Sequence, residues 1–252
     1  MLTKDAAICI RAIDYSETSQ ILTLFTRATG KISAIAKGSK RPKSSFDGPV
    51  EAFSSGKIVF TATSGEKLAT LTEFQQQPSF PHLRDNLFVL NCALFAAELV
   101  NHLTHEYDPH PELFDSFLQF LQNLNEQRTV NNEQQNVIAL LILFQLSLLK
   151  EVGLQPVLSH CVNCKMSNER LATSDEVYFT STANGLICRD CEAAFTEKIK
   201  LTKNAAACLS SLKTLARTNE KTLKEIEKIL IYHFTNILGR PPKMAKHVTR
   251  RS

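Results

Sequence analysis

The sequence predicts an α+β fold in which a small β-barrel is followed by a helical domain. Five of the eight glycines lie between Gly30 and Gly65, and glycines at such intervals are typical of turns between short strands. After Pro78 and Pro81 the apolar residues recur at helical spacing instead. With 43% of its 252 residues apolar, the chain can build the core of one large domain or of two small ones.

Five N-terminal segments are rich in β-branched and aromatic residues, which favour strands. These strands suggest an antiparallel barrel of the OB or SH3-like kind, because closing the sheet removes its exposed edges. The predicted strands are residues 6–13, 20–27, 31–37, 50–60 and 68–74. We expect a barrel domain over residues 1–80.

The remaining residues, 81–252, predict helices. Apolar side chains recur at helical spacing from Leu87 to Val100 and from Leu113 to Leu124. Residues 134–152 are apolar almost all round, which predicts a buried central helix. Two closing helices are expected at 203–216 and 221–238. The longest apolar run, 137–149, is shorter than the roughly 20 residues that a membrane span needs.

Charge is distributed unevenly along the chain. The net charge is +4, made up of +3 over residues 1–80, −5 over 81–150 and +6 over 151–252, so different faces should meet different partners. The seven cysteines are an odd number, and the first residues lack the apolar core of a signal peptide. We therefore expect reduced thiols and a cytoplasmic location.

The strongest chemical signal is a pair of Cys-x-x-Cys motifs. Cys161 and Cys164 form the first motif, and after 23 residues Cys188 and Cys191 form the second. Two such knuckles complete a tetrahedral shell of four thiolates, which suits one structural Zn²⁺ per chain with no open position for a substrate. Thiols buried in a core, or a redox pair, are the alternatives, but a redox pair needs only one such motif. The predicted zinc-ribbon-like insertion covers about residues 157–195, with a strand at 177–180 and a turn at Asn184-Gly185.

A basic stretch without acidic residues lies between Glu17 and Asp47. Its cluster at residues 37–43 predicts a flexible loop that could follow a phosphate backbone; an ordinary solvated loop is the alternative. On a barrel of the OB kind such a loop favours nucleic acid. The candidate DNA-binding residues are Arg27, Lys31, Lys37, Lys40, Arg41 and Lys43. Residues 240–252 are also basic, and they predict either a disordered tail or a second DNA contact.

Base stacking would need aromatic side chains, and the chain has no tryptophan. We expect most of the nearby rings to be core residues and Phe46 to be the most exposed. The candidates are Tyr15, Phe25, Phe46, Phe53 and Phe60. No phosphate-loop, dinucleotide-binding, HExxH or GxSxG motif is present, so nothing in the sequence supports a catalytic site.

These residues resemble the bacterial recombination mediator family RecO. The resemblance is specific over residues 14–44, especially in the run Ala-Lys-Gly-Ser-Lys-Arg-Pro-Lys-Ser at 36–44, and at the four cysteines of 161–191. Shorter matches lie at 51–53, 71–73, 80–84 and 238–243. The resemblance covers nearly the whole chain but is loose through the helices.

The resemblance implies an N-terminal OB fold, a helical domain and an embedded zinc module. It also implies a non-enzymatic protein that binds single- and double-stranded DNA and anneals complementary strands. With RecR it would help RecA replace single-strand-binding protein (SSB), whose C-terminal tail the family binds. Two other readings remain open: a zinc-containing scaffold whose barrel binds protein, and a nucleic-acid enzyme with an unrecognised site.

Overall fold

The computed structural model describes residues 2–62, 68–77, 80–127, 133–167, 170–171 and 176–249. Gly65, Pro78 and the last two arginines lie outside these residues. The chain forms two compact units that interleave in sequence: residues 1–85 with 97–125, and residues 86–96 with 126–252. Helix α1 (Leu87–Leu103) therefore contributes to both units.

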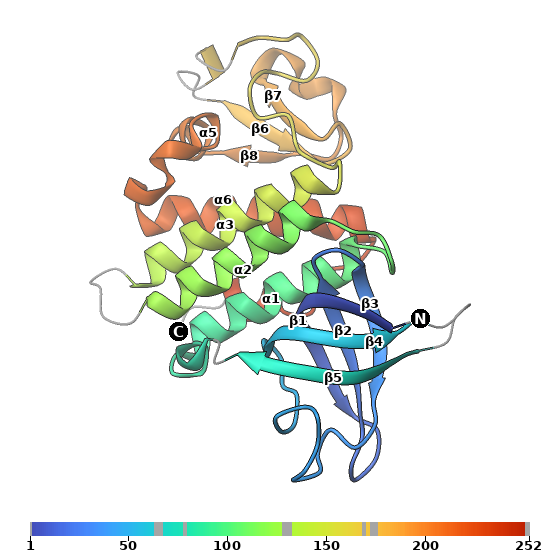
Figure 1. Cartoon of the computed structure of the whole chain (residues 1–252). Coiled ribbons are helices and arrows are strands. Elements are labelled where there is room, and N and C mark those ends of the chain that lie inside the picture. The colour runs from blue at the N-terminus through green and yellow to red at the C-terminus, as the bar shows by residue number, and fades with distance from the viewer. Residues whose placement is uncertain are drawn as a thin grey trace. The chain divides into compact units, whose positions relative to one another are not determined.

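The first unit contains the predicted barrel, and it is OB-fold-like. Its strands are β1 (Leu2–Asp14), β2 (Gln20–Thr26), β3 (Gly30–Ala36), β4 (Ser55–Thr61) and β5 (Ala69–Gln77). They close in the order β1-β2-β3-β5-β4, and Figure 1 draws them in blue to teal. The pairing of β3 with β5 is parallel, so the barrel is not wholly antiparallel as the sequence suggested.

The predicted strand at 50–60 begins five residues late, at Ser55. Phe53 has a φ of 70°, and its N–H donates to the carbonyl of Cys9 at 2.7 Å, which turns the chain before β4 starts. Gly56 follows with a φ of 156°, and a Cβ there would lie 2.0 Å from the carbonyl oxygen of Gln75. Only glycine lets β4 approach β5 this closely.

Helix α2 (Pro111–Glu126) covers one side of the barrel in the same unit. The ring of Phe25 on β2 lies 5.9 Å from that of Phe114 and 6.4 Å from that of Phe117. A short 3-10 helix, η1 (Pro81–Arg84), precedes α1. These ring contacts hold α2 against the barrel.

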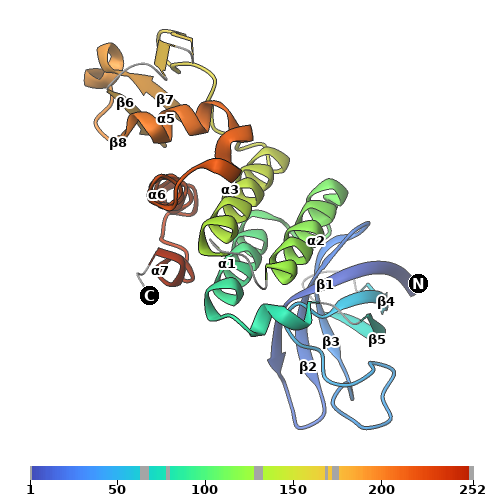
Figure 2. The same ribbon diagram turned by 90° about the vertical axis from the view of Figure 1, so that its left-hand side faces the viewer.

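The second unit is built on α3 (Glu133–Glu151) and α6 (Glu220–Leu238), which pack side by side (Figure 2). Asn219 caps α6 by accepting the N–H of Thr222, and Gly239 ends it with a φ of 67°. The helix predicted at 203–216 is interrupted, because Ser211 leaves helical conformation. The chain forms α5 (Lys203–Ser210) and then a 3-10 helix, η3 (Leu212–Arg217), that buries Leu215.

The cysteine region of this unit carries a three-stranded antiparallel sheet. Its order is β7-β6-β8, with β6 (Val177–Thr180), β7 (Gly185–Cys188) and β8 (Ile199–Leu201). The predicted strand at 177–180 is confirmed, and β6 and β7 form a hairpin; its turn covers residues 181–184, and Gly185, predicted as a turn residue, is the first residue of β7. The 3-10 helix η2 (Arg189–Ala194) follows β7, and α7 (Ala245–Thr249) is the last helix described.

None of the helices in the described part of the chain has the length and apolar character needed to cross a membrane.

Candidate metal centre and nucleic-acid interface

The four cysteines of the two motifs come together in the second unit. Their sulfur atoms all lie within 4.8 Å of one another. Cys161 and Cys164 lie on a turn before β6, Cys188 ends β7 and Cys191 lies on η2. Three of them are buried and Cys164 is exposed.

The first knuckle has the local geometry that a Cys-x-x-Cys turn needs. Lys165 follows Cys164 with a φ of 62°, and its N–H donates to the carbonyl of Cys161 at 2.9 Å. Gly185 opens β7, and a Cβ there would lie 2.6 Å from the carbonyl oxygen of Val157 and 2.6 Å from Cγ1 of Val162. A glycine at this position therefore lets β7 pack closely enough to bring Cys188 to the knuckle.

The donor set fits a tetrahedral metal ion. The sulfurs of Cys164 and Cys188 are 3.7 Å apart, and a tetrahedron with Zn–S bonds of about 2.3 Å has S–S edges of about 3.8 Å. Burial opposes ionisation of the Cys161 thiol, but backbone N–H groups, including that of Cys188, outweigh burial and lower its pKa to about 7. Burial raises the pKa of Cys188 to about 12. A metal ion bound here would favour the thiolate form of all four cysteines, because metals bind the deprotonated sulfur.

Among the described residues, a polar contact and an aromatic contact connect the cysteine region to α6. Ser181, in the β6–β7 turn, lies 2.8 Å from Nδ1 of the buried His233. The ring of Phe179 on β6 meets the imidazole edge to face at 5.3 Å. Burial lowers the pKa of His233, so the neutral ring is the form that packs here. Residues of the β6–β7 hairpin thus pack directly against α6.

The structure separates the six basic residues into two groups. Lys31 is buried, its ammonium group donates to the carbonyls of Asn101 at 2.5 Å and Thr104 at 2.6 Å, and burial lowers its pKa. Arg27 binds both carboxylate oxygens of Asp115 on α2, at 2.9 and 2.8 Å. These two side chains hold α1 and α2 against the barrel.

The other four basic residues lie together on the turn at residues 37–43. Lys37, Arg41 and Lys43 are exposed, whereas the ammonium group of Lys40 donates to Asp14 at 2.8 Å. Among the described residues, Lys37, Arg41 and Lys43 have no ion-pair partner. This turn is therefore the part of the predicted interface that faces solvent with free charge.

The segment after β3 is held in place, contrary to the flexible loop we expected. Buried Gln20 accepts the N–H of Val50 and the hydroxyl of Ser39, both at 3.0 Å, and donates to the carbonyl of Val50 at 3.1 Å. Phe46 is 2% exposed and belongs to the barrel core. The prediction that Phe46 is the exposed ring is wrong, because this segment closes the barrel with its apolar side chains.

Tyr15 is the exposed aromatic residue of the set named from the sequence. The residue is 64% exposed, whereas the four phenylalanines of that set, Phe25, Phe46, Phe53 and Phe60, are buried. It lies in the turn between β1 and β2. Tyr15 was one of the five candidate stacking residues, but no sequence pattern distinguished it from the four phenylalanines.

The basic C-terminal stretch is ordered over residues 240–249. Pro242, Ala245 and Val248 are buried, so the disordered-tail alternative does not hold there. Arg250 and Arg251 lie outside the described residues.

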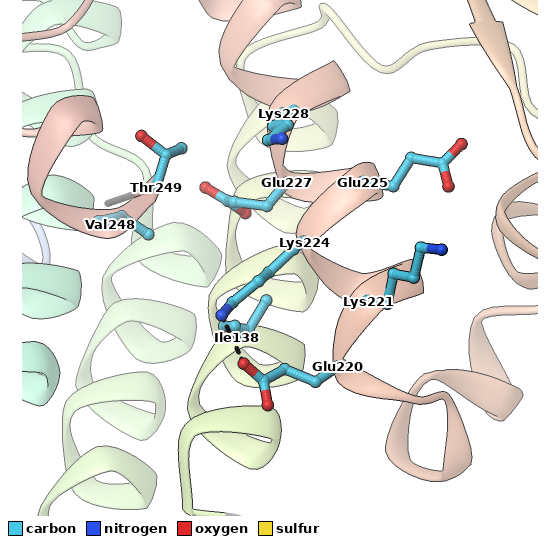
Figure 3. A pocket seen from close by; sticks show the side chains of 9 residues that line it. All are labelled: Ile138, Glu220, Lys221, Lys224, Glu225, Glu227, Lys228, Val248 and Thr249. Carbon is cyan, nitrogen blue, oxygen red and sulfur yellow. Dashed lines mark ion pairs between the residues drawn. The ribbon is translucent and has the colours of Figure 1, made fainter. Parts of the chain in front are cut away.

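A pocket of about 540 Å³ opens among α3, α6 and α7 in the second unit (Figure 3). Glu227 on α6 lines it and is 2% exposed. One of its oxygens accepts the amide of Gln145 on α3 at 2.8 Å. Burial raises the pKa of Glu227 to about 8. Glu227 was not among the residues predicted from the sequence, although a carboxylate among the apolar positions of α6 was a signal for it.

Comparison with known proteins matches nearly the whole chain to one family. Its models, "Recombination protein O N terminal" and "Recombination protein O C terminal", match residues 1–80 and 84–246. The DNA repair protein RecO of Bacillus subtilis (strain 168) is 34% identical over 230 residues, which is 90% of this chain and 84% of that protein. The RecO of Bacillus pumilus (strain SAFR-032) is 30% identical over 246 residues, 95% of this chain and 90% of that protein. The RecO of Salinibacter ruber (strain DSM 13855 / M31) is 40% identical over 124 residues, about half of each chain.

Proposed function

Because this chain belongs to the RecO family of DNA repair proteins, we propose that it is a non-enzymatic recombination mediator that binds DNA and anneals complementary strands. With RecR it would help load RecA onto single-stranded DNA coated with SSB. The observation that carries the proposal is the turn at 37–43, which presents Lys37, Arg41 and Lys43 to solvent on an OB-like barrel.

The mechanism we propose is electrostatic. Two DNA strands repel each other through their phosphates, and cations on a protein surface displace the counterions that otherwise screen them. A turn that carries three exposed cations lowers this repulsion locally, and base pairing then supplies the favourable free energy of annealing. No bond is made or broken, so no nucleotide cofactor is needed.

Support for this surface comes from its rigidity as well as its charge. The hydrogen bonds of Gln20 to Val50 and Ser39 fix the segment from which the turn projects. Cations on a fixed turn lose less conformational entropy on binding than cations on a mobile loop. Contacts of this kind neutralise phosphates without reading base sequence.

We further propose that Cys161, Cys164, Cys188 and Cys191 hold one structural Zn²⁺. The ion would add no open coordination position and would stabilise the sheet of β6, β7 and β8. The proposed partners RecR and the SSB tail are supported only by membership of the RecO family.

The direct test is annealing of two complementary labelled oligonucleotides, one coated with SSB, over a salt series without nucleotide. We expect acceleration that fades as salt rises. A Lys37→Glu/Arg41→Glu variant should lose most of it, while Lys213→Glu/Arg217→Glu, the same charge change on exposed residues of η3, should keep it.

Two results would contradict the proposal. Normal annealing by the Lys37→Glu/Arg41→Glu variant would remove the turn from the mechanism. Absence of annealing and of salt-dependent DNA binding by the unmodified chain would favour a barrel that binds protein instead.

A further inference from the structure

We propose that the turn between β1 and β2 and the basic turn after β3 form one surface selective for single-stranded DNA, on which Tyr15 stacks against an unpaired base. We call residues 14–19 and 37–41 together the hairpin–turn surface. The inference rests on the proposed DNA-binding function and deepens it, because it names the strand form that is preferred and the residue that selects it.

Three contacts join the two turns into one surface. The N–H of Gly38 donates to Oγ of Ser19 at 3.3 Å, and the N–H of Lys40 donates to the carbonyl of Thr18 at 3.1 Å. The ion pair of Lys40 with Asp14 adds a third contact. Tyr15 and the cations of the second turn therefore keep a fixed relation to one another.

The β1–β2 turn is itself closed and presents Tyr15 outward. The N–H groups of Tyr15 and Ser16 both donate to the carbonyl of Ser19, at 2.9 and 3.2 Å. The N–H of Ser19 donates a hydrogen bond to Oγ of Ser16 at 3.1 Å. Tyr15 on this turn is 64% exposed as a residue, so its side chain is accessible without unfolding any of the barrel.

The position of the ring and the charge around it favour nucleic acid as the occupant. OB barrels receive oligonucleotides at the loop between their first two strands, which is where Tyr15 lies. Lys37 and Arg41 are exposed on the adjoining turn. The acidic residues of the surface are Asp14, which Lys40 neutralises, and the exposed Glu17. An aromatic ring beside exposed cations matches a base beside its phosphates.

Stacking on Tyr15 requires a base whose face is open. In a duplex each base is covered by its neighbours, so only the phosphate contacts of Lys37 and Arg41 remain. The hairpin–turn surface should therefore bind both forms of DNA through charge and single strands additionally through the ring. Loss of Tyr15 should therefore weaken binding to single strands only, whereas loss of the cations should weaken binding to both forms of DNA.

The test is equilibrium binding of the full chain to a labelled single-stranded oligonucleotide and to a duplex of equal length, over a salt series. We expect Tyr15→Ala to weaken single-strand binding roughly ten-fold, as loss of one stacked base predicts, with an unchanged salt slope and duplex affinity unchanged within about two-fold. Tyr15→Phe keeps the ring and should bind single strands as the unmodified chain does.

A second readout uses the absence of tryptophan, which leaves four tyrosines as the main emitters. Single-stranded DNA should quench part of the tyrosine emission, and Tyr15→Phe should remove that part while still binding. Single-strand affinity of Tyr15→Ala equal to that of the unmodified chain, or an equal loss for duplex, would overturn the inference. Failure of the unmodified chain to bind any DNA would instead overturn the proposed function and this inference together.

Discussion

At the scale of single residues, the buried Glu227 and Gln145 form a hydrogen-bonded pair in which each side chain keeps one unsatisfied oxygen among the described residues. Oε2 of Glu227 and Oε1 of Gln145 are buried acceptors with no hydrogen-bond partner in the described part of the chain. A proton on Oε2 would turn it into a donor, and Oε1 of Gln145 is the unsatisfied acceptor on the residue already paired with it. The protonated acid therefore fits this site better than the carboxylate.

This pairing gives stability a definite dependence on pH. The folded pKa of Glu227 is about 8, above the ordinary value of 4.5, so the folded state holds a proton that the unfolded chain releases. The contribution of this proton to the free energy of unfolding is complete below pH 4.5. As pH rises from there to the folded pKa, the contribution falls by up to about 1.4 kcal/mol per pH unit. We expect Glu227→Gln to reduce the decline in melting temperature between pH 5 and 8.

The matched control for that measurement is Glu126→Gln, the same chemical change at an exposed residue. It should leave the pH profile of thermal unfolding unchanged. If Glu227→Gln instead destabilises the protein equally at every pH, the residue is needed as a carboxylate and the protonated pairing is wrong.

The roles of two single residues, Lys31 and Phe46, differ from those predicted from the sequence. Lys31 belongs to the same acid-free stretch as Lys37, yet its ammonium group is buried against two carbonyls of the α1 end. Phe46 lies in a polar, basic segment and still packs into the barrel core. Both outcomes depend on contacts with distant residues, which local composition does not encode.

At the scale of elements, the predictable features were those set by local geometry. Strand alternation, the hairpin of β6 and β7 and the helix end at Gly239 follow from short-range rules, and the structure contains all three. The break at Ser211 was missed, because residues 203–216 keep a helical apolar spacing through it. The turn at Phe53 was missed because a non-glycine residue adopts a positive φ there.

The four-cysteine module gives the clearest prediction at this scale. Bound zinc should contribute on the order of 10 kcal/mol to local folding. We therefore expect a strong chelator to make Cys161, Cys164, Cys188 and Cys191 react rapidly with a thiol reagent, counted by mass spectrometry of the alkylated chain. Native mass spectrometry before chelation should give one zinc per chain.

Cys9 is the internal control for that experiment. It is fully buried in the barrel core, and burial raises its pKa to about 12, so it should stay unmodified while the module reacts. Unchanged reactivity of the four cysteines after chelation would contradict the metal assignment. Simultaneous modification of Cys9 would contradict a collapse confined to the module.

At the scale of the whole molecule, the division of charge along the sequence has two consequences. Part of the acidic middle is used internally, since Asp115 on α2 neutralises Arg27 and Glu106 accepts the hydroxyl of Ser33 at 2.5 Å. Of the six basic residues between Glu17 and Asp47, Lys37, Arg41 and Lys43 on the turn at 37–43 therefore stay exposed and without an ion-pair partner among the described residues. Regional charge indicated a basic face correctly, but only the fold separates its free cations from those that hold helices.

If this turn neutralises phosphates, the affinity for DNA must depend on salt through Lys37 and Arg41. Affinity for a single-stranded oligonucleotide should be measured over a salt series for the unmodified chain, for Lys37→Glu/Arg41→Glu and for the Lys213→Glu/Arg217→Glu control. At about 0.7 per neutralised phosphate, we expect the logarithmic slope of the first variant to fall by at least about 1.4, while the control keeps the original slope. An unchanged slope and affinity in Lys37→Glu/Arg41→Glu would contradict the account.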